Sequence, residues 1–223
     1  MYRKWLRENR NFFGKVIIGI SETNYQHEDA EFILHRDFGL ENYIIGRSNL
    51  GLPDWRDDAV MWALTHVTSD WVLFMEQDFE IKTPAIMSRI EHLCTTVLGS
   101  FLSMGTFYGF KQGDRIHPGF LLVKSDHLLH YLSGYGVSFA PVPGVCDHFD
   151  TLTQHLEQDL RFFSLEEMGF NSPDAYEHMN GLTHNLYLRS IGQEVTYEPE
   201  QFNKYLERVQ QLNDSYDREL PRQ

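Results

Sequence analysis

The sequence is short of cysteine, and this shortage argues against a cysteine-based metal site. Only two cysteines, Cys94 and Cys146, occur among 223 residues. They lie in unrelated contexts, without the paired spacing of a metal-binding cysteine motif. The sequence therefore predicts two reduced thiols in a cytoplasmic protein.

Positive charge is also scarce, and this argues against a protein that grips nucleic acid through its overall field. Lysine and arginine number 19 against 32 acidic residues, which gives a formal net charge of −13. Binding to nucleic-acid phosphates is driven by lysine and arginine, although a local basic strip could escape this average. An acidic protein that handles a phosphorylated ligand would need a bridging cation.

Long hydrophobic runs are missing as well. No apolar run approaches the roughly 20 residues that a membrane-spanning helix needs, so no transmembrane segment is expected. Near the N-terminus, basic residues precede an apolar run, but this run covers only residues 16–20 and is followed by Ser-Glu-Thr-Asn. It predicts a first strand and not an export signal.

Apolar runs and amphipathic stretches alternate along the first 80 residues. The pattern predicts strands at 15–20, 40–49 and 71–79, with helices at 27–39 and 52–70 between them. This order is typical of an α/β fold with a mixed, mostly parallel sheet flanked by helices. In such sheets, ligands gather at the carboxyl ends of the strands.

The rest of the chain predicts a helix at 83–99, further strand and helix over 100–132, and a loop at 134–150. A helix is then expected at about 151–168, with an inner face of Leu152, Leu156, Leu160 and Phe163. A final amphipathic helix begins at Pro199, with apolar positions at Phe202, Leu206 and Val209, and a frayed polar tail follows from about Asp214.

Two acids lie at the carboxyl end of the third predicted strand. The apolar run 71–75 leads into Glu76, Gln77 and Asp78. Carboxylates at i and i+2 of an extended segment project to the same side, about 7 Å apart, and can share a divalent cation. Their oxygens suit Mg²⁺ or Mn²⁺. Alternatively, both are solvated turn residues and Asp78 caps the next helix.

These segments resemble a known family. "KVIIGISETNY", "IIGRSNLGLPDWRDDAVMWAL" and "TSDWVLFMEQDF" are similar to the base-binding, helical and DxD-strand segments of GT-A fold nucleotide-diphospho-sugar glycosyltransferases, family 2-like. The similarity covers roughly 15–190. It implies a GT-A-like, Rossmann-type single domain over 1–223. Its nucleotide-sugar and metal half spans about 15–120, its acceptor half 121–198, and its C-terminal helix and tail 199–223.

The resemblance also assigns the metal ligands. It implies that Asp78 binds the metal and that Glu76 contacts the metal or the ribose. The late segment "YEHMNGLTHNLYL" is similar to the family's histidine segment, so His178 completes the metal site and His184 is the second choice. Each histidine could instead be a satisfied, partly buried imidazole.

A catalytic base is implied at the segment "CDHFDTLTQHLEQ". The resemblance places it at Asp150, with Asp147 as the second choice, where a carboxylate would take the proton of an attacking acceptor hydroxyl. Alternatively, Asp150 or Thr151 is the N-cap of a helix, and Thr151 with Gln154 forms a capping box.

Donor contacts are expected on the nucleotide side. Glu22 would accept hydrogen bonds from the base or ribose, Tyr25 would stack on the base, and Asn49 would reach the uracil or ribose. Gly119, in "HPGFLLVKSDHLL", would let the backbone approach the sugar. Tyr25 could equally be a surface residue.

Together these features predict a cytoplasmic glycosyltransferase that uses Mn²⁺ or Mg²⁺ and a nucleotide-diphosphate sugar, with inversion favoured. The acceptor could be a glycan, a protein, a lipid-linked sugar or a modified nucleic acid, and the oligomeric state is left open. One alternative is a nucleotidyltransferase, although no Gly-rich basic phosphate loop follows the first strand. Another is an inactive, transferase-like binding subunit.

Overall fold

The computed structural model describes residues 5, 8–12, 14, 16–21, 43–48, 66–76, 78–96, 106–112, 115–126, 128, 161–179 and 182–219. Its strands are β1 (Val16–Ser21), β2 (Tyr43–Ser48), β3 (Trp71–Met75), β4 (Phe79–Ile81), β5 (Thr106–Gln112), β6 (Arg115–Lys124), β7 (Arg161–Ser164) and β8 (Tyr176–His178). Its helices are the 3-10 helix η1 (Arg10–Phe12), α4 (Pro84–Thr96), α7 (Leu182–Ser190) and α8 (Pro199–Glu219).

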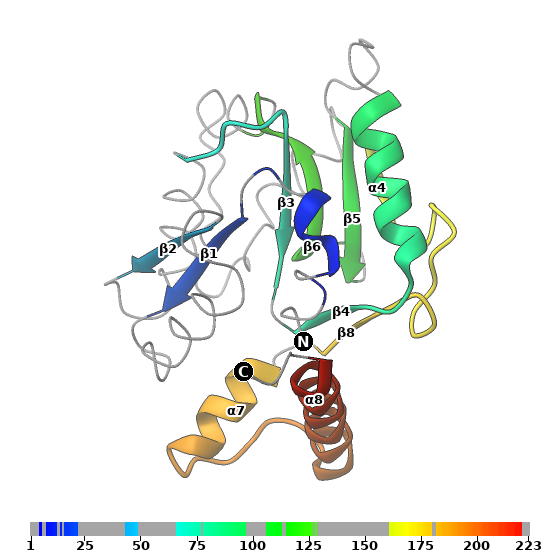
Figure 1. Ribbon diagram of the computed structural model, residues 1–223. Helices are drawn as coiled ribbons and strands as arrows, with labels where there is room; N and C mark the ends of the chain where they lie inside the picture. The colour runs from blue at the N-terminus through cyan, green and yellow to red at the C-terminus, as the bar shows by residue number, and fades with distance from the viewer. Residues whose placement is uncertain are drawn as a thin grey trace.

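The strands form three separate sheets, which corrects the predicted sheet. Their orders are β1-β2, β3-β6-β5-β7 and β4-β8 (Figure 1). Among the described strands, only the β1–β2 and β5–β7 pairs are parallel, whereas β3–β6, β5–β6 and β4–β8 are antiparallel. No extended parallel sheet joins the described strands. The prediction of a GT-A-like, Rossmann-type, mostly parallel sheet is therefore wrong for this part of the chain.

The link between β5 and β6 explains part of this difference. Residues 113–114 alone separate the two strands, and a parallel connection needs a dozen or more residues. The strands therefore form a hairpin. Strand β6 lies between β3 and β5 and runs opposite to both of them.

Strand β6 tolerates a proline because its ladder is irregular at that point. Phe110 pairs with His117, but Gly109 pairs with Leu121, so the register shifts between two neighbouring residues of β5. Pro118 lies within the skipped part of β6. Since proline has no N–H to give to a ladder, a bulge is where a strand can accommodate it.

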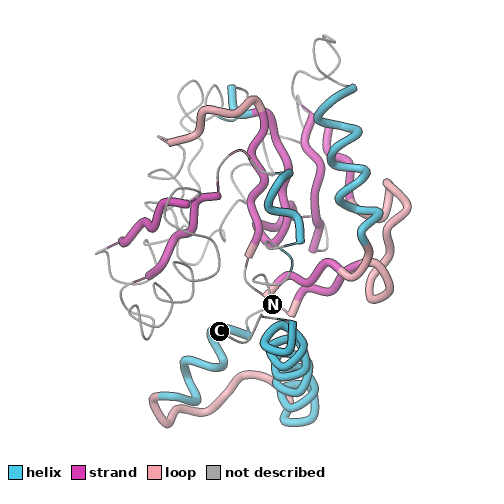
Figure 2. The backbone as a smooth tube through the Cα atoms, viewed as in Figure 1, coloured by secondary structure: helices cyan, strands magenta, loops and turns pink. Residues whose placement is uncertain are grey.

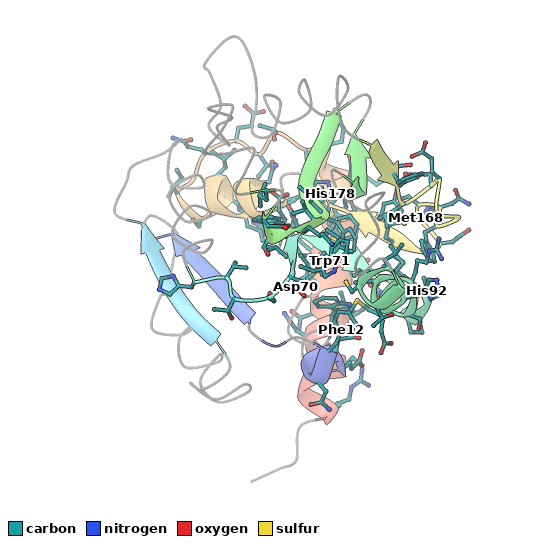
Figure 3. The ribbon with its side chains drawn as sticks, turned by 90° about the horizontal axis from the view of Figure 1, so that it is seen from above. Phe12, Asp70, Trp71, His92, Met168 and His178 are labelled. Atoms are coloured by element: carbon teal, nitrogen blue, oxygen red, sulfur yellow. The ribbon has the colours of Figure 1, made fainter. Side chains whose placement is uncertain are left out.

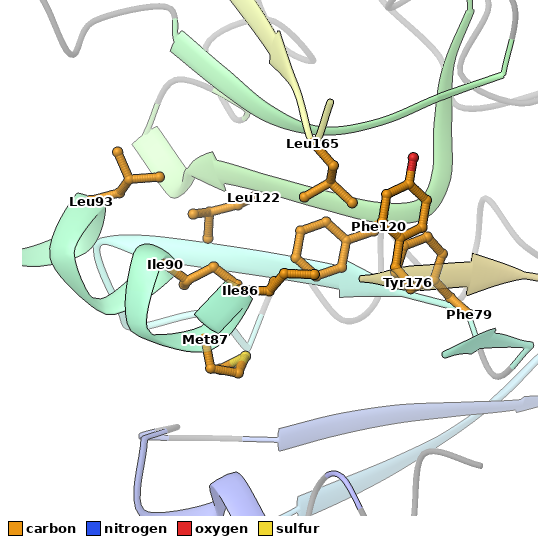
Figure 4. Close-up of a cluster of buried hydrophobic side chains, with 9 residues drawn as sticks. All are labelled: Phe79, Ile86, Met87, Ile90, Leu93, Phe120, Leu122, Leu165 and Tyr176. Atoms are coloured by element: carbon orange, nitrogen blue, oxygen red, sulfur yellow. The ribbon is translucent and has the colours of Figure 1, made fainter. Parts of the chain in front are cut away.

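The main core lies between helix α4 and one face of the four-stranded sheet (Figure 4). On α4, the buried residues recur at helical spacing: Ile86, Met87, Ile90 and Leu93. They meet the β6 side chains of Phe120 and Leu122, which alternate along the strand and so share a face. The predicted helix at 83–99 is confirmed in this position, and Pro84 stands in its first turn.

The opposite face of β6 is covered too. Leu121 and Val123 alternate with the core residues and are fully buried. A strand buried on both faces is continuously apolar, and the run Phe120–Val123 has this character. The sheet is therefore an interior layer at β6.

The ribbon of β4 and β8 lies beyond one end of the four-stranded sheet, with α7 and α8 beside it (Figures 1 and 2). On α8, Phe202 and Tyr205 are buried against Met179 and Leu182, and Leu206 and Val209 pack on them. The predicted apolar face of the last helix is confirmed. None of the described helices combines the length and apolarity that crossing a membrane requires.

Two other predictions fail. Residues 161–164, expected within a helix, form strand β7 and pair with β5. Phe163, expected on the inner face of that helix, is 39% exposed. The tail expected to fray from about Asp214 stays helical to Glu219. The predicted helix at 27–39 and residues 52–65 of the predicted helix at 52–70 lie outside the described residues. Residues 66–70, expected at the end of that helix, are turn, coil and bend and not helix.

Core packing against α4 can be tested at Ile90, which is 3% exposed. We expect Ile90→Val to lower the free energy of unfolding by about 1 kcal/mol and Ile90→Ala by about 2–5 kcal/mol. The larger truncation leaves a cavity that the sheet cannot fill. Denaturant unfolding measures both values.

The exposed Ile191 is the matched control, and Ile191→Ala should stay within about 0.5 kcal/mol of wild type. Equal losses at both positions would contradict the assigned core.

Candidate metal centre

Two acids and a histidine converge where β3, β4 and β8 meet. Glu76, Asp78 and His178 each offer one ligand atom, and these atoms all lie within 4.8 Å of one another. His178 belongs to the buried interior of the described structure, whereas His92 lies on the exposed side of α4 (Figure 3). The structure thus brings together three residues that the sequence separates by up to 102 positions.

The end of β3 positions Glu76. Strand β3 pairs with β6 as far as Met75 opposite Phe120. One residue further, the Glu76 N–H donates to the Gly119 carbonyl oxygen at 3.1 Å. This bond extends the ladder by one step and fixes the backbone from which the Glu76 side chain projects.

A turn then brings Asp78 toward Glu76. The Phe79 N–H donates to the Glu76 carbonyl oxygen at 3.2 Å, a bond that closes a four-residue turn between β3 and β4. The extended segment expected from the sequence, with carboxylates about 7 Å apart, is therefore wrong. The turn replaces the extended segment, and a carboxylate oxygen of each acid lies within the 4.8 Å group.

The β4–β8 ribbon brings His178 to the acids. In this antiparallel pair, Phe79 is opposite His178. The Met179 N–H donates to the Asp78 carbonyl oxygen at 2.9 Å and continues the pairing beyond the strands. The Phe79 ring stacks between Tyr176 and Phe120, with centroids 5.3 Å from each. The ribbon is thus anchored in the core at the residue beside Asp78.

The side chains of the site are close and largely buried. His178 Nε2 lies 3.3 Å from Glu76 Oε2 and 3.6 Å from Asp78 Oδ1. The exposed fractions of the three side chains are 4% for His178, 9% for Asp78 and 23% for Glu76. Asp78 is therefore not the solvated turn residue considered as an alternative. Glu76 keeps the most solvent contact and marks the open side of the site.

Two opposing effects act on the histidine. Burial alone would lower the pKa of His178, but its close contacts with Asp78 and Glu76, and their negative charges, raise that pKa to about 9. The imidazole is therefore protonated at neutral pH in the absence of a metal. The pair of carboxylates creates a place that favours positive charge.

Tyr197 supports the site through the backbone next to His178, and no sequence motif predicted this role. Its hydroxyl donates to the Met179 carbonyl oxygen at 2.9 Å. Burial, and then the charge of Asp78, raise the pKa of this phenol above its usual range, so it stays protonated. The backbone N–H of Tyr197 donates to Asn185 Oδ1 at 3.2 Å, and the backbone N–H of Thr196 donates to the same oxygen at 2.6 Å.

The donor set fits a divalent cation. Two carboxylates and an imidazole supply charge and three ligand atoms, and they leave coordination positions for substrate oxygens or water. An oxygen-rich set suits Mn²⁺ and Mg²⁺, and the imidazole also makes Zn²⁺ a competitor. Glu76, Asp78 and His178 are the residues that would hold the ion.

The other predicted site residues are not part of the three-residue cluster that the structure describes. Gly119 is buried in β6, where its carbonyl oxygen binds the Glu76 N–H. His184 lies on helix α7, and its side chain is outside the described part. The remaining candidates lie outside the described residues: Glu22, Tyr25, Asn49, Asp147 and Asp150.

Comparison with family models, curated proteins and solved structures finds no match to this chain. The site must therefore be interpreted from its own chemistry.

The proton on His178 gives a test of the metal centre. A metal ion and this proton compete for Nε2, so Mn²⁺ should bind more tightly as the pH rises toward 9. We expect affinity to rise about tenfold per pH unit between pH 6.5 and 8.5, with release of about one proton. Calorimetry in buffers of different ionisation enthalpy measures both quantities.

The control is His178→Gln, which removes the titrating group. It should bind Mn²⁺ more weakly and with a nearly flat pH profile. A wild-type affinity that is independent of pH over this range would rule out His178 as a ligand.

Proposed function

We propose that this chain is a glycosyltransferase that depends on Mn²⁺ or Mg²⁺ and moves a sugar from a nucleotide-diphosphate donor to an acceptor. One observation carries the proposal: Glu76, Asp78 and His178 offer ligand atoms within 4.8 Å of one another. The resemblance noted in the sequence implies this set of residues, from an acid-x-acid triplet and a distant late histidine.

The character of the centre supports the handling of a phosphorylated ligand. The chain carries a net charge of −13, so a diphosphate is repelled unless a cation lies between it and the acids. A bound divalent ion supplies that neutralisation and stabilises the departing nucleotide diphosphate. The two carboxylates and the imidazole would hold such an ion, and the site is partly open to solvent, since the Glu76 side chain is 23% exposed.

The proposed reaction also needs a base near the acceptor. We assign this role to Asp150, with Asp147 as the alternative. The carboxylate takes the proton of the acceptor hydroxyl while that oxygen forms its bond to the anomeric carbon and the bond to the diphosphate breaks. A single carboxylate is sufficient for an inverting transfer.

The proposal is carried by the metal centre and makes no use of a particular sheet topology. One fold supports many activities, and one chemistry recurs on unrelated folds. The chemistry of the three side chains is the same whichever sheet topology carries them.

A donor panel with a matched variant tests the function. Wild-type protein and Asp78→Asn are incubated with UDP-, GDP- and TDP-sugars, Mn²⁺ and glycan, protein, lipid-linked sugar or modified nucleic acid acceptors. We expect nucleotide-diphosphate release by the wild type and a roughly 100-fold slower reaction in Asp78→Asn, since the substitution removes a ligand charge without changing shape.

Asp174→Asn, at an exposed acid in the turn before β8, is the control and should keep wild-type activity. Full activity in Asp78→Asn would overturn the proposal. A wild type that binds Mn²⁺ and nucleotide without turning over any donor would instead be a binding subunit, and release of pyrophosphate would indicate nucleotidyl transfer.

A further inference from the structure

The ribbon that carries His178 and directly follows Asp78 places two like charges opposite each other. Strands β4 and β8 have only three residues each, and an isolated two-stranded ribbon is marginally stable in water. Glu80 and Glu177 stand directly opposite each other in this pair. Like charges at opposed positions destabilise strand pairing. The ribbon therefore needs compensating cations to keep its register.

That register decides the geometry of the site. Phe79 and His178 form the neighbouring pair, and Asp78 immediately precedes Phe79. Fraying of the ribbon would move Asp78 away from His178. Any group that neutralises Glu80 or Glu177 therefore acts on the metal centre without touching the metal.

Helix α8 supplies the principal compensation. Arg208 binds Glu80 with both ends of its guanidinium: Nε donates to Oε2 at 3.1 Å, and a terminal nitrogen donates to Oε1. The Glu80 side chain is 8% exposed, so this pair is shielded from water on the acidic side. Glu177 accepts from Lys82 Nζ at 2.6 Å, while the more distant Lys204 lies 3.9 Å away and is 73% exposed.

The apolar side of α8 fixes where Arg208 stands. Phe202 and Tyr205 pack on Met179, the residue that follows His178. Lys204 and Arg208 are four positions apart and so share one face of the helix, which is turned toward the two acids. The helix is therefore bound to the ribbon by apolar contact and by ion pairing at once.

We propose that Arg208 is a positioning residue of the metal centre. Through its two-point ion pair with Glu80, beside Glu177, it holds β4 and β8 in the register that brings Asp78 to His178. This inference rests on the metal binding that the proposed function requires, but not on the identity of the transferred group.

The sign of the effect separates positioning from simple electrostatics. Arg208 is a cation near the site, and by Coulomb repulsion alone its removal would strengthen the binding of Mn²⁺. Loss of positioning has the opposite effect. Substitution of a residue that orients metal ligands typically weakens metal affinity by about 10- to 100-fold.

The experiment is a calorimetric titration of the full chain with Mn²⁺ alone. We expect Arg208→Gln to bind Mn²⁺ at least about tenfold more weakly than the wild type and to broaden the Mn²⁺ paramagnetic resonance spectrum. The double variant Glu80→Gln with Arg208→Gln should recover to within about threefold of wild type, because the unpaired carboxylate is gone.

Arg218→Gln is the matched control on the same helix. Arg218 is exposed, and its Nε donates to the Asp214 carbonyl oxygen of the same helix at 3.0 Å, so its substitution should leave Mn²⁺ affinity unchanged. Unchanged or tighter binding in Arg208→Gln would overturn the inference, as would a double variant that binds no better than Arg208→Gln.

Circular dichroism shows whether Arg208→Gln is folded. If it is not, Arg208→Lys decides, since lysine keeps the charge but loses the two-point grip. A loss of about threefold or more supports positioning, and wild-type affinity contradicts it. One combination separates the two proposals. If Arg208→Gln binds Mn²⁺ more weakly but the wild type turns over no donor, the positioning role is supported and the transferase activity is contradicted.

Discussion

The pairing of β4 with β8 is the interaction on which the candidate site depends. It places Phe79 opposite His178 and lets the Met179 N–H reach the Asp78 carbonyl oxygen at 2.9 Å. The two faces of this short ribbon have different environments. Phe79 and Tyr176 stack in the core, whereas Glu80 and Glu177 face cations. Core packing and ion pairing thus stabilise the same three-residue register.

The centre itself balances desolvation against attraction. Burial disfavours charge on His178, yet the two nearby carboxylates outweigh this cost and raise the pKa of the imidazole to about 9. In the metal-free protein, the proton partly neutralises the acids. A divalent cation would take over that role with a larger charge, so proton binding and metal binding are alternative solutions to one electrostatic demand.

Helices α7 and α8 support this arrangement from outside the four-stranded sheet. Asn185 accepts three hydrogen bonds at Oδ1 and so fixes the loop that carries Tyr197. Tyr197 in turn binds the carbonyl oxygen of Met179, next to His178. The C-terminal part of the chain is therefore linked to the candidate site by the hydrogen bond from Tyr197 to the Met179 carbonyl oxygen.

Local elements with strong apolar periodicity follow from the amino-acid pattern alone. The strands at β1, β2 and β3 and the helices at α4 and α8 follow from apolar spacing, because burial of one face imposes that spacing. The acid-x-acid triplet after an apolar strand also singled out Glu76 and Asp78. Periodicity failed at residues 161–164, where parallel pairing with β5 overrides the helical pattern.

How these elements pair and meet depends on contacts that form in the folded chain. Strand direction in the sheet and the approach of His178 rest on hydrogen bonds between residues distant in the chain. The approach of Asp78 to Glu76 rests on a local turn. Arg208 and Glu80 are 128 positions apart, and the sequence around either residue does not indicate that they pair. Such contacts follow from packing of the whole chain, and no local pattern records them.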